Sequence, residues 1–109
     1  MEISYKDSKL RKLCENSREA SRKLGADSAG KLRRRLAELD AADNVNELIA
    51  GNPHPLDGDK SGQFSLALAG GKRLVFTPDH DPIPLKDDTG INWLAVTAVT
   101  IIYIGDYHD

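Results

Sequence analysis

The last residues of the chain combine side chains that can move protons. Asp106, Tyr107 and His108 follow an apolar, β-branched run that ends at Ile104. The end of a rigid strand can hold such groups with the precision that catalysis requires, whereas a free polar terminus cannot. A frayed polar terminus is the commoner meaning of such an ending, so the sequence leaves both interpretations open.

Three further polar residues stand out in the middle of the chain. His54 lies between two prolines, where a lone histidine is more often packed or hydrogen-bonded than a base. Lys60 lies in a segment dense in turn residues, where solvation is the default state of a lysine. Arg73 interrupts an apolar run, so its guanidinium must emerge on an open face of the sheet or find a partner there.

Together these side chains could cleave RNA without a metal. That reaction needs a base for the 2′-hydroxyl proton, cations for the charge on the pentavalent phosphate, and an acid for the 5′-oxygen. His54, Tyr107 and His108 could exchange the protons, since histidine suits acid or base work at neutral pH. Lys60 and Arg73 could hold the phosphate. The attacking hydroxyl belongs to RNA, so DNA is not cleaved by this route.

No cofactor or metal is expected. Cys14 is the single cysteine, which excludes a disulfide framework and a zinc ribbon. The triplet Asp79-His80-Asp81 could touch an ion, but adjacent residues in a Pro-rich loop lack the spacing of a known site. Gly70-Gly71-Lys72 leads into a strand instead of a helix, so it predicts a hairpin turn and not a phosphate loop.

The length of 109 residues predicts one domain, 1–109, because a second core would have almost nothing to bury. Hydrophobic residues make up 39% and charged residues 29%, which excludes a disordered tail. No run approaches the ~18 apolar residues of a membrane span, and the charged N-terminus lacks the features of a secretory signal. A cytoplasmic protein without a membrane contact is expected.

Charge is divided unevenly along the chain. Residues 1–35 carry eleven Lys and Arg against five Asp and Glu, a net +6, and residues 36–109 carry four against twelve, a net −8. The basic first third could bind a polyanion or an acidic protein, because local potential steers association more than net charge does. An ordinary helical surface rich in Arg and Lys is the alternative.

The first third of the chain has the 3.6-residue period of helices. Residues 2–5 alternate as a short strand, and one helix is expected over residues 8–24, where Gly25 stops it. A second helix begins at residue 27 or 28, with Leu32 and Leu39 on its apolar stripe. The run Arg33-Arg34-Arg35 is expected outside that stripe, on an exposed face.

After residue 53 the period changes to two. Strands are expected over residues 54–56, 64–68 and 73–76, with a hairpin turn at Gly70-Gly71. Thr77–Asn92 is predicted to be a long surface loop, and Trp93–Ile104 a central strand. The fold class is therefore α+β, with a small antiparallel sheet of three or four strands and an N-terminal helical pair packed on one face. The other face stays open for function.

The sequence resembles the HigB branch of the RelE/ParE toxin superfamily, also called plasmid maintenance killer proteins. The resemblance covers essentially the whole chain, including Leu-Arg-Arg-Arg-Leu in the second helix, and is carried by three motifs: His54-Pro55-Leu56-x-Gly58-Asp59-Lys60-x-Gly62-Gln63-Phe64-Ser65, Lys72-Arg73-Leu74-Val75-Phe76 and Asp106-Tyr107-His108. It implies a RelE/ParE-like β-α-α-β fold, a neighbouring helix-turn-helix antitoxin, and ribosome-dependent cleavage of mRNA. The implied active-site group is His54, Lys60, Arg73, Asp106, Tyr107 and His108.

The chain departs from that family pattern at two places. Asp57 stands where the family commonly has a lysine, and the Thr77–Asn92 loop is longer than usual. Two other functions therefore stay open: a ParE-like inhibitor of DNA gyrase that catalyses nothing, and an inactive toxin homologue that acts as a binding partner. The terminal Asp-Tyr-His favours the nuclease. The exposed Arg33-Arg34-Arg35 face predicts that an antitoxin covers the helical pair or blocks the cleft.

Overall fold

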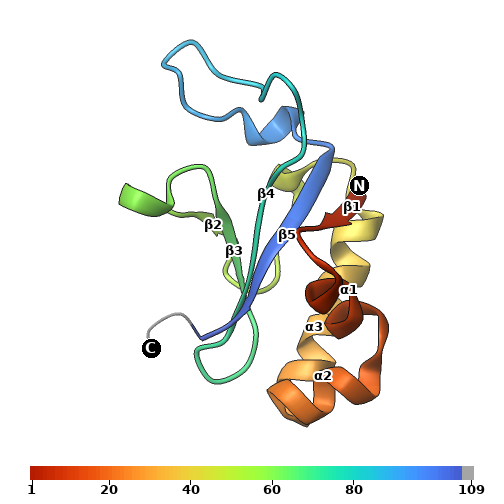
Figure 1. Ribbon diagram of the computed structural model, residues 1–109. Helices are drawn as coiled ribbons and strands as arrows, with labels where there is room; N and C mark the ends of the chain where they lie inside the picture. The colour runs from red at the N-terminus through yellow and green to blue at the C-terminus, as the bar shows by residue number, and fades with distance from the viewer. Residues whose placement is uncertain (107–109) are drawn as a thin grey trace.

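A five-stranded sheet forms the middle of the molecule in the computed structural model, which describes residues 1–106. Its strands are β1 (Glu2–Tyr5), β2 (His54–Pro55), β3 (Phe64–Ala67), β4 (Arg73–Pro78) and β5 (Ala98–Gly105). They lie in the order β1-β5-β4-β3-β2 (Figure 1). The predicted α+β class is confirmed.

The predicted antiparallel arrangement is confirmed for β2, β3, β4 and β5, and β1 adds a parallel strand at one edge, so the sheet as a whole is mixed. β1 runs parallel to β5, with Glu2 beside Ala98 and Tyr5 beside Ile101. Parallel neighbours need a long crossover connection, and here the helices and the three antiparallel strands β2, β3 and β4 all lie between the two in the chain. Strand direction at this edge is set by that path and not by any local pattern in residues 2–5.

Three helices, and not the predicted pair, precede β2 within the described residues: α1 (Ser8–Glu15), α2 (Ser17–Leu24) and α3 (Ala26–Ala41). The expected helix over residues 8–24 breaks at Asn16, whose backbone is extended (φ −123°, ψ 103°). The Asn16 amide donates to the Lys12 carbonyl, and its side chain accepts from the Glu19 amide at 3.1 Å. Asparagine is a strong N-cap, so one residue ends α1 and starts α2.

The helices and one face of the sheet share one hydrophobic core. Leu10, Leu32 and Leu39 from the helices are buried together with a set of strand residues: Phe64, Leu66, Leu74, Phe76, Val99 and Ile101. Figure 1 shows the helices gathered beside β1 and β5, with β2 at the opposite edge of the sheet. The helices therefore do not cover the second face of the sheet.

The β3–β4 hairpin forms as predicted. Gly70 and Gly71 both have positive φ, +59° and +86°, which is the backbone of a two-residue type I′ turn. The Leu68 amide donates to the Lys72 carbonyl at 2.8 Å, and the Lys72 amide donates to the Ala69 carbonyl at 3.1 Å. Beyond this turn, Arg73 lies opposite Ala67 in the ladder.

The predicted strand over Trp93–Ile104 begins later than expected. Trp93–Ala95 is a 3₁₀ turn, and β5 starts at Ala98. The Trp93 ring meets the Phe64 ring edge-on, with centroids 4.8 Å apart, so it packs beside the core instead of pairing in the sheet. The predicted loop is also shorter at its start, because Thr77 and Pro78 belong to β4.

The His80 side chain connects the loop that follows β4 to the backbone at the start of β5. Its Nε2 atom accepts from the Thr97 amide at 3.1 Å and the Ala98 amide at 3.3 Å. His80→Ala is expected to lower the free energy of unfolding by about 1–2 kcal/mol, because both amides lose their acceptor. Urea unfolding measures this change. Asp87→Ala, in the same loop and exposed, is the matched control and should change stability by less than about 0.5 kcal/mol.

Cys14 gives the fold a pH dependence. Burial, and next the charge of Glu15, raise the pKa of its thiol from 9.0 to about 12. The unfolded chain loses this proton near pH 9 while the folded chain keeps it, so stability should fall as the pH rises from about 9 towards 12. Urea midpoints over this range should decline more gently in Cys14→Ala. Parallel declines in the two proteins would contradict this prediction.

No helix within residues 1–106 is long and apolar enough to cross a membrane.

Candidate active site

The sheet face that points away from the helices, here called the outer face, gathers polar side chains from four strands. Residues opposite each other in an antiparallel ladder share a face. His54 lies opposite Ser65, Ser65 opposite Val75, and Val75 opposite Tyr103, so one row crosses β2, β3, β4 and β5. A second row, Ala67-Arg73-Gly105, lies one step along the strands. The outer face therefore carries His54, Arg73 and Tyr103.

A β-bulge in β5 decides which side chains reach this face. Val75 pairs with Tyr103 while the next residue, Phe76, pairs with Ile101, so Ile102 is an extra residue in β5. Strict alternation would put Tyr103 in the core on the same face as Ile101. The bulge moves Tyr103 to the outer face and turns Ile104 inward against the core.

Tyr103 is a candidate that the sequence did not indicate, because it lies within an apolar strand. Its side chain is 37% exposed and lies along the strand over Gly105. A Cβ atom at Gly105 would stand 3.0 Å from the tyrosine hydroxyl oxygen, so glycine leaves the space that the ring occupies. The signal that could have revealed it is an aromatic residue two positions before a glycine at a strand end.

His54 is held in a form that suits a base. Its Nδ1 atom lies 2.7 Å from the Asn52 carbonyl oxygen. A carbonyl only accepts, so Nδ1 carries the hydrogen and the neutral ring keeps its lone pair on Nε2. Asn52 has φ +47°, in the left-handed region that asparagine tolerates better than most residues, and this conformation helps to direct its carbonyl at the ring.

Two polar atoms on the outer face lack hydrogen-bond partners among the described residues. They are Nη1 of Arg73 and Oγ of Ser65, and both are buried. Ser65 itself is fully buried, whereas Arg73 is only partly so. A buried donor without an acceptor costs about 1–3 kcal/mol. An anionic oxygen brought by a ligand would satisfy the guanidinium with a charge-assisted hydrogen bond.

The remaining predicted residues lie at two ends of this face. Lys60 ends the 3₁₀ turn Gly58–Lys60 between β2 and β3, and its amide donates to the Asp57 carbonyl at 3.2 Å. Asp57 is exposed. Asp106 follows β5 beside the β3–β4 turn, with its carboxylate 3.7 Å from where a Cβ of Gly71 would lie. Tyr107 and His108 fall outside the described residues.

The structure therefore brings some of the predicted group together. Arg73 lies opposite Gly105, directly before Asp106, while His54 and Lys60 lie towards the β2 edge. His54 is two strand spacings from β4, about 10 Å across the sheet. The roles of these residues stay predictions.

The prediction that Arg33, Arg34 and Arg35 share one exposed face is wrong for Arg35. It is only 8% exposed, while Arg33 and Arg34 are exposed as expected. Arg35 lies three residues after Leu32 and four before Leu39, so helical geometry puts it on the buried stripe. Its Nη1 lies 3.3 Å from Glu38 Oε1. Its stem packs under Gly51, where an added Cβ would stand 3.1 Å from the arginine Cδ.

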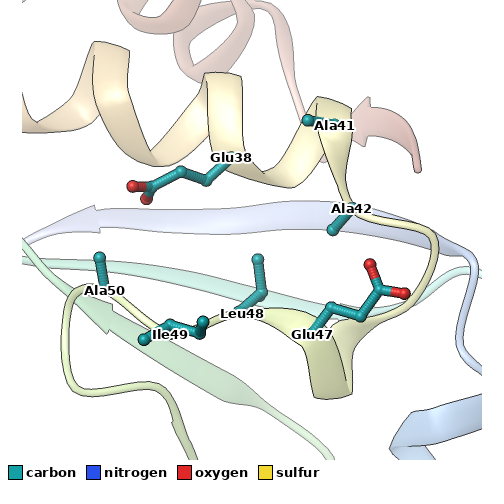
Figure 2. A pocket seen from close by; sticks show the side chains of 7 residues that line it. All are labelled: Glu38, Ala41, Ala42, Glu47, Leu48, Ile49 and Ala50. Atoms are coloured by element: carbon teal, nitrogen blue, oxygen red, sulfur yellow. The ribbon is translucent and has the colours of Figure 1, made fainter.

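A separate hollow of about 360 Å³ lies beside this ion pair, between the end of α3 and the segment after the Val45–Glu47 turn. Figure 2 shows Leu48 and Ala50 directed towards α3 and Glu38 above them. Ile49 at its rim is 89% exposed. None of the predicted site residues lines this hollow.

No group of three or more His, Cys, Asp or Glu side chains converges within residues 1–106. In the triplet Asp79-His80-Asp81, His80 already uses Nε2 to accept from two backbone amides. The outer face instead offers the Arg73 guanidinium and the His54 imidazole. These groups can bind an anion and move a proton.

The comparison with solved structures identifies the fold of this chain. No family model matches the chain, and no curated protein matches it in sequence. A solved structure described as "YoeB/ParE toxin from Agrobacterium tumefaciens" is similar over 98% of this chain and 99% of that chain, with a TM-score of 0.60 and 15% identity. At this identity the likeness shows the fold, which is that of a YoeB/ParE toxin.

Proposed function

We propose that this protein is the toxin of a type II toxin–antitoxin pair and cleaves mRNA on the ribosome. The outer face carries the proposal: His54 presents a basic Nε2 atom, and Arg73 on the same face has a buried Nη1 without a partner among the described residues. The toxin fold over the whole chain supports it. The motifs at His54, Arg73 and Tyr107-His108 favour the HigB branch.

The proposed chemistry needs no metal. A base takes the proton of the 2′-hydroxyl, whose oxygen forms a bond to phosphorus while the bond from phosphorus to the 5′-oxygen breaks. A protonated group gives its proton to that 5′-oxygen, leaving a cyclic phosphate and a 5′-hydroxyl. We assign the two proton transfers to His54 and the Tyr107-His108 pair. Arg73 and Lys60 stabilise the phosphate charge, and Asp106 orients its neighbours.

Primer extension on translating mRNA tests this function. Purified protein is expected to produce discrete breaks within the message when ribosomes are present and none when they are omitted. Tyr107→Ala and His108→Ala should each reduce the breaks at least about a hundredfold, because each removes a proton-transfer group. Arg34→Ala, an exposed arginine of α3, is the control and should leave cleavage unchanged.

Other outcomes identify the alternatives. Inhibited DNA supercoiling with intact message would overturn the nuclease and support a non-catalytic gyrase inhibitor. Intact message and unaffected gyrase would support an inactive homologue, for which Asp57 in place of the usual lysine is the best argument.

The partners follow from the same proposal. A helix-turn-helix antitoxin is expected to bind this toxin in the cytoplasm and to leave Arg33 and Arg34 less exposed in the complex. Co-expression with the neighbouring reading frame should yield a stable complex that cleaves no message. Free expression of the toxin alone, without slower growth, would contradict this partner.

A further inference from the structure

An open groove of about 750 Å³ runs along β1, at the edge of the sheet farthest from β2. Residues 1–5 line it throughout, and helix α1 and the ends of α3 and β4 form its walls. Figure 1 shows β1 outermost in the sheet, beside β5. None of the residues proposed for catalysis lines this groove, so it is a second surface of the protein.

The backbone of β1 offers hydrogen-bonding groups to this groove. In a parallel ladder alternate residues bond to the neighbouring strand. The Glu2 amide donates to the Thr97 carbonyl at 3.2 Å, and the Lys6 amide donates to the Ile101 carbonyl at 2.9 Å. The amides and carbonyls of Ile3 and Tyr5 therefore point away from β5. A row of such groups at a sheet edge can pair with an added strand.

The charges of the side chains that line the groove indicate which charge an added strand should carry. Glu2, Glu15, Asp40 and Asp79 are all exposed and line it. Arg11 is the basic side chain among the lining residues, and its guanidinium carbon lies 5.5 Å from the centre of the Tyr5 ring. A second copy of this chain would bring the same carboxylates face to face, which disfavours pairing between two β1 edges.

We infer that the groove along β1 binds an extended, basic segment of a partner polypeptide, which joins the sheet as a sixth strand. Backbone hydrogen bonds to Ile3 and Tyr5 supply the pairing, and Lys or Arg side chains at alternate positions meet the carboxylates. The inference rests on the edge geometry and the charges, and it stands whether or not the protein cleaves RNA.

Three acetylated hexapeptides test the inference by amide chemical shifts of the ¹⁵N-labelled, untagged protein. The first alternates Lys and Val, the second alternates Glu and Val, and the third is the Lys-Val peptide methylated at alternate backbone nitrogens. The first should bind and shift the amides of residues 2–5, with Ile3 and Tyr5 gaining protection from hydrogen exchange. The Glu-Val peptide should not bind, because its carboxylates are repelled by those of the groove. The methylated Lys-Val peptide should not bind, because it lacks backbone amide donors.

Two pairs of variants separate pairing from folding. Ile3→Pro removes the outward amide but no ladder bond, since proline is tolerated at such edge positions. Ile3→Ala loses the same side chain and keeps the amide. Peptide binding should vanish in the first and persist in the second. Glu15→Lys with Asp79→Lys should weaken binding about tenfold at low salt, while Asp87→Lys with Asp88→Lys should not.

Several results would overturn the inference. Equal binding of the Lys-Val and Glu-Val peptides would remove the role of charge. Shifts centred on the hollow around Ile49, or no shifts at all, would remove the role of β1. Protection of Ile3 and Tyr5 in a dimer of the free protein would assign the edge to a second copy instead.

Discussion

Arg73→Ala is expected to lower message cleavage by two to three orders of magnitude, which is about the loss seen when one donor to a transition-state oxyanion is removed. Arg73 lies on the outer face of the sheet, and its Nη1 is buried without a partner among the described residues. A buried donor without an acceptor does not stabilise the fold, so the variant should unfold at a urea midpoint no lower than that of the wild type. Primer extension with translating ribosomes measures the loss.

Two further variants give this experiment its controls. Arg73→Lys keeps a charge but not the planar fork, so it should recover part of the activity. Arg34→Ala removes an exposed arginine from α3 and should be neutral. Full activity in Arg73→Ala, or a loss that follows the fall in stability, would exclude Arg73 from phosphate binding.

His54→Ala is expected to lower cleavage by about two to four orders of magnitude, the usual contribution of a positioned general base or acid. The hydrogen bond from Nδ1 to the Asn52 carbonyl fixes the ring and leaves Nε2 to exchange the proton. A glutamine at this position can hydrogen-bond but cannot exchange a proton, so His54→Gln should lose nearly as much as alanine.

The pH profile of cleavage distinguishes catalysis from structure for His54. If His54 exchanges a proton in the reaction, the wild-type pH profile should contain a limb that both His54 variants lack. His80→Gln provides the matched histidine replacement, since His80 binds backbone amides in a loop of the fold. An unchanged profile in His54→Ala would show that His54 only packs.

The elements that local chemistry determines could be predicted. Two consecutive glycines between apolar runs define the β3–β4 turn, because Gly70 and Gly71 adopt positive φ without strain. Asp7 caps α1 through a hydrogen bond of 2.9 Å from the Leu10 amide, and aspartate is among the preferred N-cap residues. These features depend on residues within one turn of each other, so the order of residues is enough to define them.

Three features of the fold were not predicted. Asn16 interrupts a stretch whose apolar spacing continues across it, so the break between α1 and α2 was missed. Arg35 was placed by its charge, although its spacing from Leu32 and Leu39 puts it on the buried stripe. The parallel partner of β1 lies more than ninety residues away, at Ala98 and beyond.

The candidate site likewise contains residues that the sequence indicated and one that it did not. His54 was predicted as a group that could exchange protons, and Arg73 because an arginine within an apolar strand must reach an open face or a partner; the roles of both stay predictions. Tyr103 was not found, because its alternation with Ile101 predicts burial. The extra residue Ile102 reverses that alternation, and only the pairing of β5 with β4 shows where the extra residue stands.

The sequence by itself determined the α+β class, the hairpin, and the residue types that could carry acid–base chemistry on a phosphate. The tertiary structure decided which of those side chains share a face, which edge of the sheet stays open, and which arginine is buried. The physical reason is the separation along the sequence of the residues that determine each feature. Turns and caps are set by neighbouring residues, whereas a shared face depends on strand register, and one bulge or one distant partner changes that register for every residue that follows.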